Sequence, residues 1–204
     1  PNNAIQFPGS SAYVTFGAAP QLGVSTFTIE AWFKRTGQGV GTSTGALGFD
    51  GSATGNNALA IPLVTKGRAQ TDGSNVDMNF FLGINDTTGA LLADFEDSNS
   101  TPQTGVNHPV TGVTAIPISA TTWHHAAATY DGTTWRLYLD GALDKEEVEG
   151  AFTPRSDSIQ HAAIGSALTS TGAASGFFAG VIDEVRIWNR ALSLSEIQAN
   201  INQP

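Results

Sequence analysis

Acidic residues stand at alternate positions near the middle of the chain, in the segment Asp94-Phe95-Glu96-Asp97. Because successive strand residues point to opposite faces, Asp94 and Glu96 are expected to share one face of a sheet, and Asp97 to begin a loop. Two carboxylates on one face suit glycoside hydrolysis, as general acid and nucleophile, or the coordination of a hard cation. A solvated strand end is the third interpretation.

Other oxygen-bearing side chains flank this segment: Asn75, Asp77 and Asn79 precede it, and Asn107 and His108 follow it. Carboxylate and amide oxygens are suitable Ca²⁺ ligands, whereas the imidazole of histidine is not. If the loop that follows Asp97 folds back over the strand 77–84, these groups line one pocket. Turn formation by Asn and Asp is the alternative, and His108, which precedes a proline, is typical of a loop-anchoring residue.

From this region we predict two kinds of site residue. Asn107 and His108 are candidates for ligand contact. Possible Ca²⁺ ligands are Asp77, Asp94 and Asp97.

A second acidic pair, Asp183-Glu184, interrupts an apolar strand. Alternation places Asp183 on the same face as Val181, Val185 and Ile187, which predicts that it points inward. A buried carboxylate needs a cation or several hydrogen bonds. We therefore expect Asp183 either to be a structural Ca²⁺ ligand or to accept hydrogen bonds from backbone amides or a neighbouring side chain.

Trp32 is the aromatic residue best placed to contact a sugar. In the run Phe27–Phe33, apolar residues alternate with Thr28, Glu30 and Trp32, so Trp32 lies on the polar side of the predicted strand. An exposed ring can stack on the apolar face of a pyranose. Packing of the ring within the fold is the alternative, because large aromatic side chains usually bury area.

The composition argues against several classes of function. A formal net charge of −9 without any cluster of basic residues argues against nucleic-acid binding. With no Cys and four His, a zinc site is not expected. No apolar run approaches the ~20 residues of a membrane span. The acidity is typical of an extracellular module with carboxylate-lined cation sites, and solubility explains it equally well.

The elements that would position these residues are strands. Apolar and polar residues alternate in short runs throughout the chain, which predicts one all-β domain over residues 1–204. Asp131-Gly132 and Asp140-Gly141 predict hairpin turns, and Ser193 with Glu196 predicts a capped helix at the C-terminus. Residues 37–57 and 97–114 are polar and predict loops, where binding sites usually reside.

Five segments together resemble the laminin-G-like (concanavalin A-like) domains of bacterial secreted and surface proteins. They span nearly the whole chain in order and comprise residues 4–14, 27–33, 123–132, 135–141 and 180–192. The resemblance implies a jelly roll of two antiparallel sheets with a short C-terminal helix. Members of this family bind glycans, proteins or each other, some of them through Ca²⁺.

Two departures from the family pattern bear on function. Pro8 stands where the family often has an Asp that can bind a cation. Ser98 stands at the third alternate position after Asp94 and Glu96, where the glucanases of this fold have a third carboxylate. The resemblance therefore implies a domain without the glucanase signature.

These observations predict a non-catalytic binding module that recognises carbohydrate, with Ca²⁺ as a structural or ligand-bridging ion. Protein–protein adhesion or a spacer role is the alternative, and a glycosidase or lyase is the less favoured third class. The chain begins at Pro1, without an initiator Met or a signal peptide, so we expect a domain of a larger secreted or surface protein.

Overall fold

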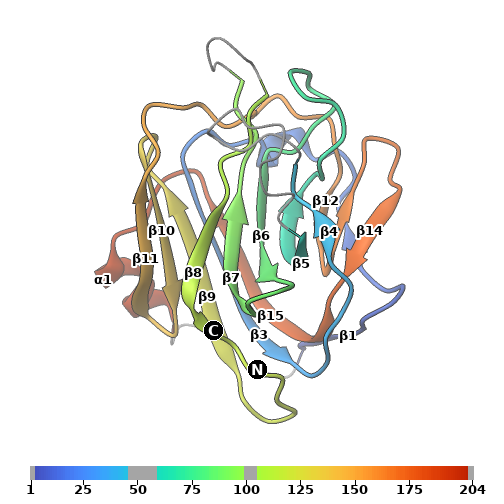
Figure 1. The fold of residues 1–204 in the computed structure, drawn as a ribbon, viewed down its shortest axis with the longest axis vertical. Helices are drawn as coiled ribbons and strands as arrows, with labels where there is room; N and C mark the ends of the chain where they lie inside the picture. The colour runs from blue at the N-terminus through green and yellow to red at the C-terminus, as the bar shows by residue number, and fades with distance from the viewer. Residues whose placement is uncertain (1–2, 46–58, 99–104, 202–204) are drawn as a thin grey trace.

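The computed structural model describes residues 3–45, 59–98 and 105–201, which form two large stacked antiparallel sheets and one small sheet of two strands (Figure 1). The first sheet has the strand order β1-β15-β3-β9-β10-β11. Its strands are β1 (Ile5–Pro8), β15 (Ala179–Trp188), β3 (Phe27–Arg35), β9 (His124–Tyr130), β10 (Thr134–Leu139) and β11 (Ala142–Val148). Because β15 lies between β1 and β3, the two ends of the chain pair within one sheet.

The second sheet has the order β2-β12-β5-β6-β7-β8, and the short strand β4 also pairs with β5. Its strands are β2 (Val14–Thr15), β4 (Thr42–Ser43), β5 (Leu59–Lys66), β6 (Phe80–Asn85), β7 (Ala90–Asp94), β8 (Val110–Ala115) and β12 (Ala162–Ile164). The remaining elements are η1 (Pro20–Leu22), β13 (Ser166–Leu168), β14 (Ala174–Phe177) and α1 (Leu194–Asn200). The predicted all-β, two-sheet jelly roll with one short α-helix is confirmed.

Aromatic side chains fill the space between the two sheets. The ring of Phe27 on β3 lies 5.7 Å from that of Phe80 on β6 and 5.5 Å from that of Trp135 on β10. Phe95 and Tyr130 approach to 4.5 Å between ring centroids. All five side chains are fully buried, and burial of such rings is the main contribution to the stability of a sandwich of this kind.

The predicted turn at Asp140-Gly141 is confirmed. These residues have φ angles of 52° and 76°, as a two-residue turn of type I′ between β10 and β11 requires.

Helix α1 packs on the outer face of the first sheet. Ser193 accepts a hydrogen bond from the backbone N–H of Glu196, whose side chain accepts one from the backbone of Ser193, so the predicted capping box is confirmed. Ile197 is fully buried and packs with Ala127 and Tyr138, which belong to β9 and β10. Neither helix of the described residues has the length and apolarity that crossing a membrane requires.

The predicted loop 97–114 contains a strand, which corrects the interpretation of that segment. Strand β8 begins at Val110 and pairs with β7 through Ala93↔Val110 and Leu92↔Thr111. Its burial falls along its length because it is an edge strand, and Val113 is 76% exposed. The polar composition therefore reflects an exposed edge and not an irregular loop. Residues 46–57 and 99–104 of the two predicted loops lie outside the described residues.

Lys66, at the end of β5, is a fully buried charged residue. Its Nζ donates hydrogen bonds to the carbonyl oxygens of Ala18, Ser158 and Gln160 at 2.8, 2.9 and 3.1 Å. These three bonds use the full donor capacity of an ammonium group. Burial lowers the pKa of Lys66 to about 8. The side chain thus connects β5 to two loops that are distant in sequence.

We expect Lys66→Met to lower the free energy of unfolding by about 1–3 kcal/mol, because three carbonyl groups lose their donor and two of these hydrogen bonds are buried. Urea unfolding followed by tryptophan fluorescence measures the change. The matched control is Lys145→Met, which removes an exposed ion pair to Glu147 at 3.0 Å and is expected to change stability by less than about 1 kcal/mol. Equal effects of the two substitutions would contradict the structural role of Lys66.

Candidate metal and ligand site

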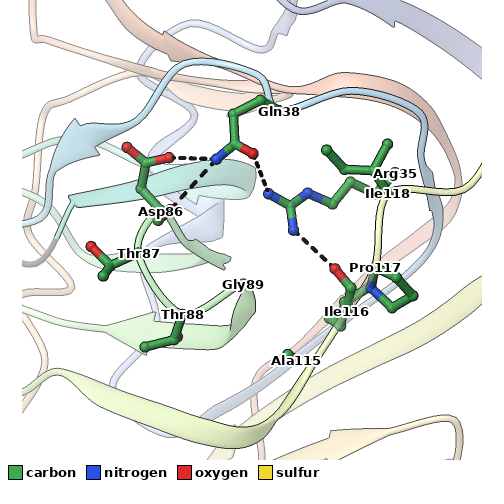
Figure 2. A pocket seen from close by; sticks show the side chains of 10 residues that line it. All are labelled: Arg35, Gln38, Asp86, Thr87, Thr88, Gly89, Ala115, Ile116, Pro117 and Ile118. Carbon is green, nitrogen blue, oxygen red and sulfur yellow. Dashed lines mark hydrogen bonds between the residues drawn. The ribbon is translucent and has the colours of Figure 1, made fainter.

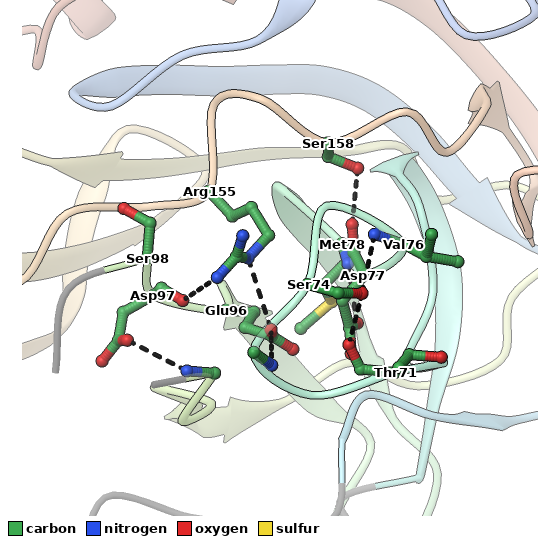
Figure 3. A network of polar contacts seen from close by, with 12 residues as sticks. Thr71, Ser74, Val76, Asp77, Met78, Glu96, Asp97, Ser98, Arg155 and Ser158 are labelled. Atoms are coloured by element: carbon green, nitrogen blue, oxygen red, sulfur yellow. Dashed lines mark hydrogen bonds and ion pairs between the residues drawn. The ribbon is translucent and has the colours of Figure 1, made fainter. Parts of the chain in front are cut away.

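Three carboxylates meet at the end of the second sheet where β6 begins and β7 ends. They belong to Asp72, Asp77 and Glu96, and one oxygen from each lies within 4.8 Å of the others. We refer to these three residues as the acidic cluster. Asp77 and Glu96 are fully buried, whereas Asp72 is exposed. Figure 3 shows Asp77 and Glu96 with the residues that bond to them.

Glu96 occupies the centre of this network. Its Oε1 accepts a hydrogen bond from the backbone N–H of Gly73 at 3.1 Å and lies 3.4 Å from Nε of Arg155. Its Oε2 is buried without a hydrogen-bond partner. Because a buried carboxylate oxygen without a partner is costly, this atom marks a place that a cation or a proton can occupy.

The two oxygens of Asp77 accept hydrogen bonds from backbone N–H groups, Oδ1 from Met78 at 2.7 Å and Oδ2 from Gln70 at 3.3 Å. Burial raises the pKa of Asp77, and burial together with the adjacent Asp77 carboxyl raises the pKa of Glu96. The positive charge of Arg155 offsets only part of this effect. Oxygen ligands in this number and proximity suit Ca²⁺.

Asp94 and Asn107 also contribute buried oxygens. Asp94 is fully buried and neither of its carboxylate oxygens has a hydrogen-bond partner. Asn107 donates from Nδ2 to the carbonyl of Thr44 at 2.9 Å, while its Oδ1 has no partner. Burial raises the pKa of Asp94 well above its usual range.

Of the Ca²⁺ ligands predicted in this region, Asp77, Asp94 and Asp97, only Asp77 belongs to the acidic cluster, where it meets Glu96. The carboxylate of Asp97 turns away from them. Its Oδ2 lies 2.9 Å from Nε2 of His108, and its Oδ1 accepts a hydrogen bond from Gly105. Asp72 was missed, because a single Asp in a loop resembles any turn residue in the sequence.

His108 lies between two carboxylates, with Nε2 2.9 Å from Asp97 and Nδ1 3.3 Å from Glu149. Its ring stacks on Phe95 at 4.7 Å and contacts Phe152 at 4.2 Å. Burial lowers the pKa of His108, but the hydrogen bonds to the two carboxylates raise it by more, and the net change is an increase. The arrangement agrees with the loop-anchoring interpretation of this residue.

The expectation that Asp183 points inward is wrong. A β-bulge between Asp183 and Arg186 shifts the pairing of β15 with β3, and Glu184 has a φ angle of 50°. As a result Ile182 is buried in the core, whereas Asp183 lies opposite Trp32 on the other face and is only half-buried. Its Oδ1 accepts a hydrogen bond from the backbone of Glu184 at 2.9 Å. Asp183 thus lies in the first sheet, and the acidic cluster lies beside the second.

Trp32 is half-buried beside the C-terminal end of α1. Its Nε1 donates a hydrogen bond to the carbonyl of Ile201 at 3.1 Å, and its ring lies edge-on to that of His125 at 5.4 Å. The Trp32 ring therefore packs within the fold, which was the alternative to stacking on a sugar. The other two predicted contact residues, Asn107 and His108, are 2% and 0% exposed and lie beneath the surface.

The geometry disfavours glycoside hydrolysis at Asp94 and Glu96. A glycosidase needs two carboxyl groups about 5–10 Å apart on either side of a substrate cleft. Both of these carboxyl groups are fully buried. Neither of them lines either of the two surface hollows that we describe, one beside Arg35 and one beside Phe16.

We expect protonated His108 to stabilise the fold at mildly acidic pH. The pKa of His108 is raised above the unfolded value of about 6.5. Its contribution is therefore fully present below that value and is lost as pH rises through the folded pKa. Urea unfolding at pH 6 and at pH 8.5 measures how much the free energy of unfolding falls between these two pH values. We expect a smaller fall in His108→Gln than in the original protein. In the control His124→Gln, where the partly exposed ring pairs with Asp140, the fall in stability between the two pH values should equal that of the original protein. A fall in His108→Gln as large as in the original protein would refute the stabilising role of protonated His108.

Solved structures similar to this one include a carbohydrate-binding module of a sialidase, a domain of an arabinanase and a pentraxin. The CBM40 module of the Ruminococcus gnavus IT-sialidase, solved with α2,3-sialyllactose, matches with a TM-score of 0.61 and 17% identity over 97% of both chains. Domain 4 of the Geobacillus stearothermophilus arabinanase AbnA, solved with arabinotriose, has a TM-score of 0.57 and 17% identity over 96% of this chain and 75% of that one. The SAP-like pentraxin of Limulus polyphemus has a TM-score of 0.55 and 14% identity over 97% of this chain and 80% of that one.

The sequence comparisons address the family directly. No curated protein sequence matches the chain. A family model described as the concanavalin A-like lectin/glucanases superfamily matches residues 8–198. This range contains all the described strands completely, apart from β1, of which it contains only Pro8. The order of the strands and the capped helix α1 agree with that assignment. The chain therefore belongs to the concanavalin A-like lectin/glucanase superfamily.

Proposed function

We propose that this chain is a non-catalytic carbohydrate-binding module that holds one Ca²⁺ ion in the acidic cluster. The observation that carries the first part is the likeness to a saccharide-binding module over 97% of both chains. A second similar domain was solved with arabinotriose. Two saccharide complexes on one architecture support carbohydrate as the ligand class.

The burial of the acidic residues supports a binding role over a catalytic one. A general acid and a nucleophile must both contact the scissile bond. In the described residues, Asp77, Asp94 and Glu96 have no exposed surface, so their carboxylates suit a structural role. Protein–protein adhesion or a spacer function is the competing interpretation, and it predicts a folded domain without glycan affinity.

The Ca²⁺ proposal rests on the contacts within the acidic cluster. The oxygens converge within 4.8 Å, and Glu96 Oε2 lacks any hydrogen-bond partner. Ca²⁺ takes six to eight oxygen ligands, so backbone carbonyls and water would complete the shell. Bound there, the ion would connect the loop that carries Asp72 to the end of β7. A secreted or surface location is part of the proposal, because extracellular modules bind Ca²⁺ with dissociation constants on the order of 10⁻⁴–10⁻³ M.

With 10 mM CaCl₂ we expect the melting temperature to rise by about 3–10 °C relative to EDTA, as that affinity and chain length imply. Glu96→Gln should abolish the rise, because it replaces a ligand oxygen without changing the shape of the side chain. The control Glu146→Gln alters an exposed residue of β11 and should retain the full rise. A calcium response that survives in Glu96→Gln would assign the ion to another place.

Binding of the domain to a printed glycan array tests the carbohydrate proposal. We expect saturable binding to a restricted set of saccharides, measured at 5 mM CaCl₂ and again in EDTA at a temperature where both forms are folded. Circular dichroism checks the fold of each sample. A blank array with folded protein would refute carbohydrate recognition and favour the adhesion or spacer function.

A further inference from the structure

A polar hollow lies at the opposite end of β6 and β7 from the acidic cluster. Asp77 precedes β6, whereas the turn Asp86–Gly89 follows it, so the two sites are separated by the length of this hairpin. The hollow has a volume of about 370 Å³, within the range of about 300–1,000 Å³ typical of ligand pockets. Figure 2 shows that it is lined by the end of β3, the β6–β7 turn and the segment that begins at Ala115. Both sheets therefore contribute to its wall.

Arg35 is a buried cation in the wall of this hollow. The residue is 5% exposed. Its Nη1 donates a hydrogen bond to the carbonyl of Ile116 at 2.9 Å and its Nη2 donates to Oε1 of Gln38 at 3.3 Å. Its Nε is buried without a hydrogen-bond partner. The two hydrogen bonds from Nη1 and Nη2 fix the guanidinium in the wall of the hollow, and each of these nitrogens carries a second N–H.

Gln38 connects this guanidinium to a carboxylate. Its Nε2 donates to Oδ1 of Asp86 at 2.9 Å, so donors and acceptors alternate from Arg35 through Gln38 to Asp86. The turn that carries Asp86 is held by the side chain of Asn85, whose Oδ1 accepts hydrogen bonds from the backbone N–H groups of Thr87 and Thr88 at 3.0 and 2.9 Å. Such local bonds hold the polar groups in place before a ligand arrives, which lowers the entropy cost of binding.

The chemistry of the wall fits a neutral polyhydroxylated ligand. Arg35 supplies a donor, Asp86 an acceptor, and the exposed Thr87 and Thr88 hydroxyls supply both. The exposed Ile118 adds an apolar surface, as the C–H groups of a sugar ring require. Asp86 offsets the charge of Arg35, and the protein carries a net charge of −9. The negative charge of Asp86 and the negative net charge of the protein both disfavour an anionic ligand.

From this geometry we infer that the hollow beside Arg35 and Asp86 binds a sugar residue of a neutral saccharide. The inference rests on the proposed function and specifies where the carbohydrate lies and what class it belongs to. It also separates the two sites, because the ligand does not contact the acidic cluster. Ca²⁺ then stabilises the domain without coordinating the sugar.

Substitutions on strand β8 give a matched test. Ala115 lines the hollow, whereas Val113, two residues earlier on β8, is 76% exposed and does not line it. Ala115→Trp should fill the hollow and weaken binding at least tenfold, whereas Val113→Trp should bind as the original protein does. The probe is the neutral oligosaccharide with the strongest signal on an array of neutral, carboxylated and sulfated glycans, measured by isothermal titration calorimetry.

A second variant tests the hydrogen-bonding role of Asp86 separately from the effect of filling the hollow. Asp86→Asn keeps the size of the side chain and removes an anionic acceptor, so we expect affinity to fall about tenfold. Glu146→Gln, at an exposed residue of β11 outside both sites, should leave the affinity for the same saccharide unchanged when both proteins are folded. Thermal melts confirm that each variant is folded at the temperature of the titration.

The outcomes distinguish this inference from the proposed function. Saccharide binding that is unaffected by both Ala115→Trp and Asp86→Asn would overturn the location and leave the carbohydrate function intact. Binding confined to carboxylated or sulfated glycans would overturn the neutral class. A blank array with folded protein would refute both proposals together.

Discussion

One continuous layer of apolar side chains between the two sheets supports the rest of the structure. Phe27, Phe80 and Trp135 are in contact across the interface and have no exposed surface. Because side chains alternate along a strand, this layer determines which residues face outward and where the strand ends come to lie. Polar groups that cannot enter the layer collect at the two ends of the strands. The acidic cluster and the hollow beside Arg35 are both such places.

The same hairpin of β6 and β7 carries a site at each end, and the electrostatics of the two sites differ. At one end Asp77 and Glu96 are buried together with one neighbouring guanidinium, that of Arg155. At the other end Arg35 is buried, with Gln38 between it and Asp86. An excess of negative charge suits a hard cation, whereas balanced charge with alternating donors and acceptors suits hydroxyl groups. A rigid hairpin between them allows one site to stabilise the fold and the other to bind ligand.

The pattern of residues was sufficient wherever local geometry decides the structure. The strand predicted from the run Phe27–Phe33 lies within β3, because the alternation of apolar and polar residues is encoded in adjacent residues. The capping box of α1 was predictable for the same reason, since Ser193 and Glu196 lie three residues apart. In contrast, alternation failed at Asp183, because a bulge inserts residues and reverses the face that follows.

The sequence by itself determined the class of fold, the hairpins, the capped helix and the alternate spacing of acidic residues near position 96, whereas their burial came from the tertiary structure. Only the tertiary structure decided that Asp72 joins Asp77 and Glu96, and that Arg35 lies beside Asp86. The physical reason is that alternation and capping are interactions between near neighbours in the chain. A site is assembled from loops and strand ends that are far apart in sequence, and their meeting depends on the register and stacking of both sheets.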